Sequence, residues 1–111
     1  DGKQTRSMTY VSNIVNGLVK ILDERDNLNG EIINIGSSQE MSVLDSAKLI
    51  VELCNSKSKI KHISQQEAFG NYKEIKRRRA NTKKAFKLLG WKCKDDFTDK
   101  LKEVIKSLRD K

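Results

Sequence analysis

Apolar residues recur at helical spacing in four segments of the chain, and each segment predicts a helix with one packed face. The first helix is expected to begin at Ser12, whose hydroxyl can accept a hydrogen bond from a free first-turn N–H group. It is expected to end at the turn residues 26–30. The residues expected on its packed face are Val11, Ile14, Val15, Leu18 and Leu22.

The other three helices carry residues that typically start or stop a helix. Ser42, with an acidic residue three positions later, predicts the start of the second helix. Asn81 is expected to cap a helix over Thr82–Leu89, and Gly90 suits the left-handed residue that ends it. Asp96, again followed by an acidic residue at the third position, predicts the start of the last helix. These residues set the expected helix boundaries.

Three short segments favour extended structure. Thr5–Val11 contains Thr, Tyr and Val, and Glu31–Gly36 is a β-branched run closed by glycine, so both are predicted to be strands. Ile60–Ile63 predicts a further short parallel strand, and Ser64–Lys76 a loop with a helical turn. The expected fold is therefore a small, helix-rich α/β domain with about four helices and two or three short strands.

Length and charge describe one small basic domain. The chain has 111 residues, of which 34% are charged, and its formal net charge is +8. Such a balance favours anionic partners, namely nucleic acid, an anionic membrane or phosphate groups. No apolar run approaches the roughly 20 residues of a membrane span, so no membrane partner is expected. Cys54 and Cys93 lack metal-ligand spacing and predict reduced thiols in a cytoplasmic protein.

The sequence carries no complete catalytic constellation. There is no glycine-rich dinucleotide loop and no P-loop, and no nucleophile has a base at a recognisable spacing. The single histidine, His62, lies in an apolar stretch and is expected to be structural. Taken from its residues alone, the domain is predicted to bind an anion without catalysing a reaction.

Seven basic residues lie between Lys76 and Lys87, and they separate into two groups. The arginines precede the predicted helix, where free N–H groups and planar guanidinium groups suit a phosphate. Lys83, Lys84 and Lys87 lie within the helix and are expected to face solvent, whereas Phe86 and Trp91 are expected to pack. A solvated connector is one alternative. A nucleic-acid-binding surface is another, although aromatic residues make up only 5% of the chain.

Three stretches, in order, resemble the C-terminal part of the extended short-chain dehydrogenase/reductase family. They are residues 1–22, with "DGKQTRSMTYV", residues 30–50, with "NIGSSQEMS", and residues 76–105, with "RRRANTKKAFKLLGW". Members of this family are NAD-dependent nucleotide-sugar epimerases, 4,6-dehydratases and decarboxylases. The resemblance implies the same class of enzyme for the full-length parent, and it covers nearly the whole chain.

The resemblance also implies a division of labour between two halves. In the family an N-terminal Rossmann half binds NAD, carries a Tyr-x-x-x-Lys pair and forms the homodimer. Residues 1–111 resemble the smaller C-terminal lobe, and neither Tyr10 nor Tyr72 is followed by the lysine. The chain has no initiator methionine and is expected to be one domain of a longer protein. By itself it is expected to bind no NAD and to be inactive.

Four candidate substrate-binding residues follow from the resemblance. Arg6 and Arg78 match arginines that approach the ligand diphosphate, Asn34 matches a residue near the nucleotide end, and Gln4 would line the sugar side. The expected ligand is a UDP- or dTDP-sugar, with no catalytic and no metal-binding residue in this part. Two alternatives stay open: a small basic nucleic-acid-binding module, and a non-catalytic interaction domain of the same fold. The nucleotide-sugar hypothesis, which we favour, predicts no nucleic-acid partner.

Overall fold

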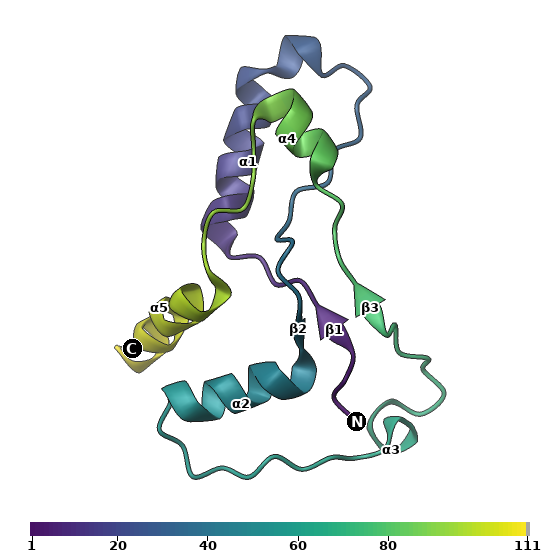
Figure 1. Cartoon of the computed structure of the whole chain (residues 1–111), viewed down its shortest axis with the longest axis vertical. Coiled ribbons are helices and arrows are strands. Elements are labelled where there is room, and N and C mark those ends of the chain that lie inside the picture. The colour runs from purple at the N-terminus through teal and green to yellow at the C-terminus, as the bar shows by residue number, and fades with distance from the viewer. Residues whose placement is uncertain (111) are drawn as a thin grey trace.

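A computed structural model describes residues 1–110, which form five α-helices, a short 3₁₀ turn at Arg25–Asn27 and three short strands (Figure 1). The helices are α1 (Val11–Asp23), α2 (Val43–Leu53), α3 (Gln65–Phe69), α4 (Lys83–Leu89) and α5 (Phe97–Arg109). The strands are β1 (Thr5–Arg6), β2 (Met41–Ser42) and β3 (Arg77–Arg78). The expected small α/β fold is confirmed, with one helix more than expected. None of these helices has the length and hydropathy needed to span a bilayer.

The sheet joins three segments that are far apart in the sequence, in the order β2-β1-β3. Strand β1 pairs antiparallel with β2, where Thr5 lies opposite Ser42. It pairs in parallel with β3, where Arg6 lies opposite Arg78. The centre of the fold is therefore a narrow crossing point, with α1 and α4 at one end of the molecule and α2 and α3 at the other (Figure 1).

The strand predictions are only partly correct. The first predicted strand is confirmed at Thr5–Arg6, but Glu31–Gly36 and Ile60–Ile63 belong to no strand in the part of the chain described. A strand needs a hydrogen-bonded neighbour, and β-branched residues alone do not supply one. Conversely, β2 and β3 have little strand character of their own, and they are strands because β1 lies between them.

Local caps explain most of the helix boundaries. The Ser42 hydroxyl accepts a hydrogen bond from the N–H of Asp45 at 2.9 Å, and Asp96 accepts from the N–H of Thr98 at 2.8 Å. Gly90 ends α4 in the left-handed conformation, with φ of 58°. These three predictions are confirmed.

Two further caps differ in detail from the prediction. The Asn81 side chain accepts from the N–H of Lys83 at 3.1 Å, so it supports the start of α4 as expected, although the helix begins one residue later. The prediction for Ser12 is wrong, because α1 begins after Tyr10 without a side-chain cap. The Ser12 hydroxyl instead lies 3.4 Å from a carboxylate oxygen of Asp95.

The small core lies between α1 and α4. Ala85, Leu89 and Trp91 are buried there, and only 1% of Trp91 is exposed. The indole N–H of Trp91 donates to the Asn13 carbonyl at 3.3 Å, which links the end of α4 to α1. The expected packing of Trp91 is confirmed. That of Phe86 is wrong, because Phe86 is 60% exposed on the outer side of α4.

The face of α1 that packs within residues 1–110 is not the predicted one. Asn13 and Gly17 are its buried residues, and a Cβ at position 17 would lie 2.8 Å from the side chain of Ile35. Glycine therefore allows α1 to approach the Glu31–Gly36 segment closely. The apolar residues of α1 that stay exposed are Val11, Val15, Leu18, Val19 and Leu22. We call this set the α1 stripe.

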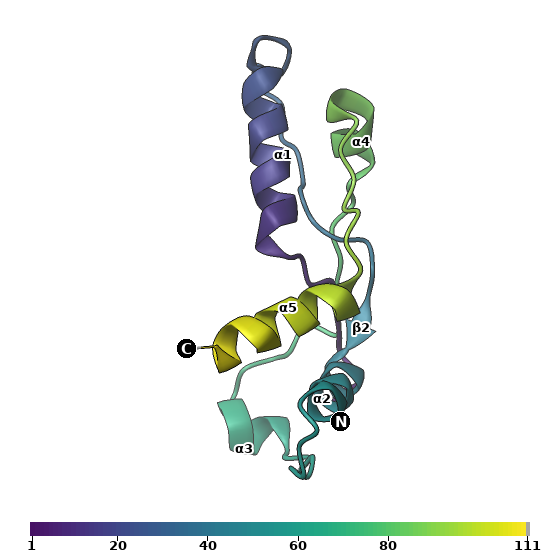
Figure 2. The same cartoon turned by 90° about the vertical axis from the view of Figure 1, so that its left-hand side faces the viewer.

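The molecule is open and thin (Figure 2). Its Cα radius of gyration is 17.2 Å, whereas a compact chain of this length has about 13 Å. Its accessible surface is 8737 Å², against about 6,200 Å² for a compact monomer of the same mass. Residues 1–110 thus leave a large apolar area exposed, and the α1 stripe is part of it.

Candidate functional site

The sheet brings together the two arginines that were predicted to bind the ligand diphosphate. Arg6 on β1 and Arg78 on β3 are opposite each other in the parallel pair. Side chains of directly opposed residues project from the same face of a sheet, and neighbouring strands are about 4.8 Å apart. The two guanidinium groups therefore start from adjacent points on one face, although the residues are far apart in the sequence.

Arg6 is held firmly by its surroundings. Its Nη1 donates to the carbonyls of Thr5 at 2.7 Å and Ile75 at 2.9 Å, and its Nη2 forms an ion pair with Glu74. An arginine has five N–H donors, so three are used here within the described residues and two are left. Arg6 is thus a pre-oriented cation whose charge is offset by one carboxylate.

Arg78 differs sharply from the arginines on either side of it. It is exposed, and its side chain has no hydrogen bond or ion pair with any of residues 1–110. Arg77 and Arg79 instead approach Glu40, with Nη to carboxylate oxygen distances of 2.6 Å and 3.6 Å. Of the three consecutive arginines, Arg78 is the one whose charge is available to an anion.

Glu40 carries a strong electrostatic signature. The hydrogen-bonded Arg77 guanidinium lowers the pKa of Glu40 to about 2; burial opposes this shift, and the Thr5 hydroxyl adds to it. The same ion pair raises the pKa of Arg77. Glu40 is therefore ionised at neutral pH, and it offsets the charge of arginines that would otherwise compete for an anion.

Gln4 and Asn34 lie at different places relative to the arginine pair. Gln4 directly precedes β1 and lines a cavity of about 730 Å³ between the N-terminus, α2 and residues 60–76. Asn34 is farther along the molecule, where its amide lies 3.4 Å from the Asn81 carbonyl and ties this segment to the start of α4. Gln4 thus lies near the arginine pair, and Asn34 lies at the far end of the β3–α4 link.

The large cavity is lined by both apolar and charged residues. Val43, Leu44 and Phe69 are among the apolar lining residues, and His62 also lines the cavity. His62 is exposed and in no strand, so the expectation of a structural strand histidine is wrong. No group of His, Cys, Asp or Glu within residues 1–110 could hold a metal ion. The lining is of mixed charge, because Asp1 and Glu74 contribute to it as well as Lys3, Lys61 and Lys76.

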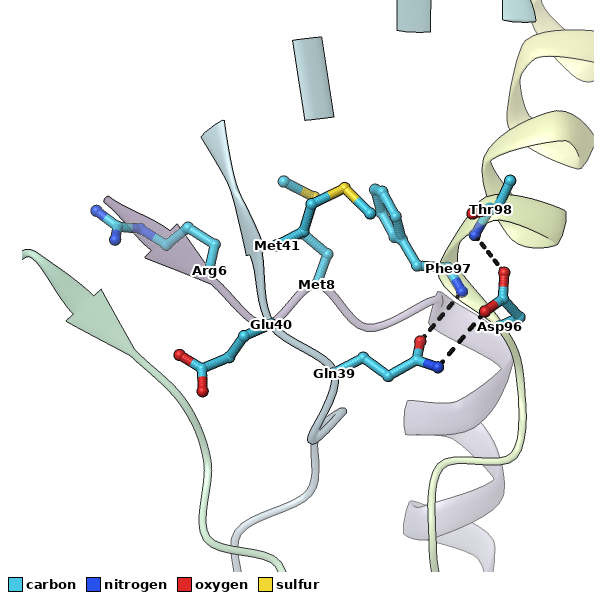
Figure 3. Close-up of a pocket in the computed structure, with 8 residues that line it drawn as sticks. All are labelled: Arg6, Met8, Gln39, Glu40, Met41, Asp96, Phe97 and Thr98. Atoms are coloured by element: carbon cyan, nitrogen blue, oxygen red, sulfur yellow. Dashed lines mark hydrogen bonds between the residues drawn. The ribbon is translucent and has the colours of Figure 1, made fainter. Parts of the chain in front are cut away.

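A smaller hollow of about 320 Å³ lies beside Arg6 (Figure 3). Arg6 and Met41 point to one side of the strands in this view, whereas Glu40 extends to the other side. The Gln39 amide bridges to α5, accepting from the N–H of Phe97 at 3.3 Å. This link fixes the β2 segment to the start of α5. The lining combines the Arg6 guanidinium with the carboxylates of Glu40 and Asp96.

Sequence reasoning missed the two carboxylates that organise this site. Glu74 lies in a segment with weak periodicity, and Glu40 lies in a predicted loop. No local pattern marks either residue, because each acts on an arginine distant in the sequence. The run of three arginines was itself the available signal, since unpaired arginines in a row predict nearby carboxylates or an anionic ligand.

The chain is similar to several known proteins. A sequence profile of the GDP-mannose 4,6 dehydratase family matches residues 1–104. The UDP-N-acetyl-alpha-D-glucosaminuronate decarboxylase of Bacillus cytotoxicus is 37% identical over 111 residues, which cover 99% of this chain and 34% of that protein. The UDP-glucuronic acid decarboxylase 1 of Xenopus tropicalis is 33% identical, with 97% of this chain and 24% of that protein covered.

A solved structure has the same fold over nearly the whole chain. The UDP-glucuronic acid 4-epimerase of Bacillus cereus, in complex with UDP-glucuronic acid and NAD, superposes with a TM-score of 0.81 and 29% identity. The match covers 97% of this chain and 34% of the epimerase. The chain therefore spans about a third or less of the length of these relatives.

Proposed function

Because the chain belongs to the GDP-mannose 4,6 dehydratase family of extended short-chain dehydrogenases/reductases, we propose that it is the substrate-binding part of a nucleotide-sugar enzyme. The parent enzyme would be an NAD-dependent epimerase, 4,6-dehydratase or decarboxylase. Residues 1–111 would form its C-terminal domain and bind the diphosphate of a UDP- or dTDP-sugar. The observation that carries this proposal is the pairing of Arg6 with Arg78 across β1 and β3.

Electrostatics supports a diphosphate as the ligand. Two arginines that start from neighbouring strands can each donate to one of two linked phosphate groups, and charge-assisted bonds of this kind are the strong ones. Arg6 is pre-oriented by two carbonyls, and Arg78 has no protein partner within residues 1–110. Gln4 would face the sugar end, and Asn34 the nucleotide end.

Nucleotide-sugar binding can be tested on the full-length protein by NMR titration with UDP-glucuronic acid and with a dTDP-sugar. We expect side-chain shifts to gather at Arg6, Arg78 and Gln4, with smaller shifts at Asn34. Shifts spread evenly over the basic surface would instead favour the nucleic-acid alternative, as would binding to single- or double-stranded DNA with a steep salt dependence.

We also propose that this part of the protein does not itself bind NAD. Each helix in residues 1–110 begins after Tyr10, Ser42, Ser64, Thr82 or Asp96. None of these starts follows a glycine-rich turn of the kind that cradles a pyrophosphate. We therefore assign NAD, the catalytic residues and dimerisation to a separate Rossmann half of the parent enzyme. An intact NAD loop and a Tyr-x-x-x-Lys pair upstream would rule out the non-catalytic alternative.

A cytoplasmic location also stays a prediction, in line with the free thiols of Cys54 and Cys93.

The α1 stripe supports the presence of a second half. Leu18 in its centre is 53% exposed, and the stripe runs along the whole helix. Continuous apolar surface of this kind marks an interaction site. We infer that the Rossmann half covers it.

Replacing Leu18 by alanine should therefore destabilise the full-length protein by about 2–3 kcal/mol, as for a buried leucine. Urea unfolding measures the change in free energy. Asn16→Ala, on the exposed polar side of the same helix, is the matched control and should cost less than about 0.5 kcal/mol. If Leu18→Ala is as harmless as the control, the stripe faces solvent in the whole protein and this assignment of the partner is wrong.

Glu74 should weaken ligand binding, because its carboxylate competes with phosphate for Arg6. Glu74→Gln removes one negative charge near the site, while the Thr5 and Ile75 carbonyls still hold the guanidinium. We expect UDP to bind roughly threefold to tenfold more tightly at low salt. Isothermal titration measures this, with Glu67→Gln on α3 as the charge-matched control. Weaker binding in Glu74→Gln would show that Glu74 is needed to orient Arg6.

A further inference from the structure

The register of β3 against β1 determines which of three consecutive arginines, Arg77, Arg78 or Arg79, lies opposite Arg6. Strand β3 has only two residues, so few backbone hydrogen bonds fix its register against β1. A slip by one residue exchanges the two faces of a strand. In a run of identical residues, such a slip would place Arg77 or Arg79 where Arg78 now lies. An interaction other than the backbone pairing must therefore determine which arginine lies opposite Arg6.

We propose that Glu40 is the positioning residue that makes this selection: it binds Arg77 and Arg79 on one face of the sheet and thereby directs Arg78 to the face of Arg6. This inference rests on the proposed function, since it concerns which arginine reaches the diphosphate. Glu40 itself would touch no ligand.

The geometry of Glu40 fits this role. One carboxylate oxygen accepts from Arg77 Nε at 2.8 Å and from the Thr5 hydroxyl at 3.0 Å, and the other accepts from Arg77 Nη2 at 2.6 Å. The contact with Arg77 is bidentate, which fixes orientation as well as distance. Because Glu40 directly precedes β2, while Thr5 belongs to β1 and Arg77 to β3, one carboxylate ties all three strands together.

The alternation of side chains along β3 places Arg78 on the face opposite to that of Arg77 and Arg79. Residues two apart on a strand share a face, so an arginine at 77 or 79 lies on the Glu40 side and one at 78 lies opposite. Arg79 Nη1 lies 3.6 Å from the same carboxylate, as this alternation requires. The Glu40 side chain is 19% exposed and ionised. A slip by one residue would place Arg78 on its side together with Lys76 or Ala80, so only the observed register gives Glu40 two arginine partners.

The selection can be tested by measuring how much Arg78 matters when Glu40 is changed. In the full-length protein, Arg78→Ala should weaken UDP binding about 30-fold. In the Glu40→Gln background the same substitution should cost less than about fivefold, because a released Arg77 or Arg79 takes its place. Glu31→Gln is the matched control, since Glu31 pairs with Lys84 on α4 away from the sheet. There the Arg78→Ala effect should remain about 30-fold.

A loss of stability alone would not change how much the Arg78→Ala substitution weakens UDP binding. The size of that effect in the Glu40→Gln background therefore separates a positioning role of Glu40 from a purely structural one. An unchanged 30-fold effect of Arg78→Ala in Glu40→Gln overturns the inference and leaves the proposed function standing. No effect of Arg78→Ala in the unmodified protein overturns the proposed function itself. If Glu40→Gln does not fold, Glu40→Asp carries the test. Its shorter carboxylate cannot reach both partners, so the Arg78→Ala effect should fall, and an unchanged effect again overturns the inference.

Discussion

Replacing Arg78 by alanine is expected to weaken binding of UDP to the full-length protein about 30-fold, within a range of roughly 10-fold to 150-fold. Hydrogen bonds to charged groups contribute about 1.5–3 kcal/mol, and tenfold in affinity is about 1.4 kcal/mol. Arg78 is exposed and has no protein partner within residues 1–110, so its removal breaks no ion pair of the fold. The loss should appear in affinity and not in stability.

Isothermal titration with UDP at low and physiological salt measures this loss, and thermal unfolding in the same buffers checks that the fold is intact. Lys87→Ala is a suitable control. It removes the same charge from the exposed side of α4, and it should change the affinity less than about threefold because exposed charges are screened over distance. Equal losses in the two variants would mean that binding depends on overall positive charge, as the nucleic-acid alternative requires.

Replacing Trp91 by alanine is expected to cost about 3–5 kcal/mol of unfolding free energy, the usual range for a buried large aromatic. Trp91 is the one large side chain within residues 1–110 that is almost completely buried. It contacts the small core of Ala85 and Leu89, and its N–H satisfies the Asn13 carbonyl. Marginally stable domains unfold on losses of this size, so α1 and α4 should separate.

Urea unfolding followed by circular dichroism measures the Trp91 effect without relying on the fluorescence of the missing indole. Trp91→Phe keeps most of the apolar area and loses the hydrogen bond, and it should cost about 1–2 kcal/mol. Phe86→Ala serves as the aromatic control on α4, where the ring is 60% exposed, and it should cost the least. A Trp91→Ala cost equal to that of Phe86→Ala would contradict the position assigned to the core.

Local chemistry was predictable from the sequence. Ser42, Asp96 and Gly90 end or start their helices as expected, because a cap depends on residues within one turn. The family resemblance drawn from three ordered motifs is also confirmed by the profile that matches residues 1–104. It depends on residue identities along the chain, which need no knowledge of tertiary contacts.

Features that depend on distant contacts were not predictable. The Glu31–Gly36 segment has strand-forming residues but pairs with no strand within residues 1–110, and Arg77–Arg78 forms a strand without them. Periodicity identified the apolar side of α1 but could not say what covers it, and within residues 1–110 the helix packs through Asn13 and Gly17. Nothing local distinguished Arg78 from its neighbours, because Glu40 lies far away in the sequence.

The most direct measurement compares UDP with UMP, which lacks the second phosphate, in four forms of the full-length protein. These are the unmodified protein, Arg6→Ala, Arg78→Ala and the double variant, each titrated with both nucleotides. If the two arginines hold one diphosphate, UDP should bind at least about tenfold more tightly than UMP in the unmodified protein. That preference should fall in each single variant and nearly vanish in the double variant. A UDP preference that survives the loss of both arginines would contradict the account.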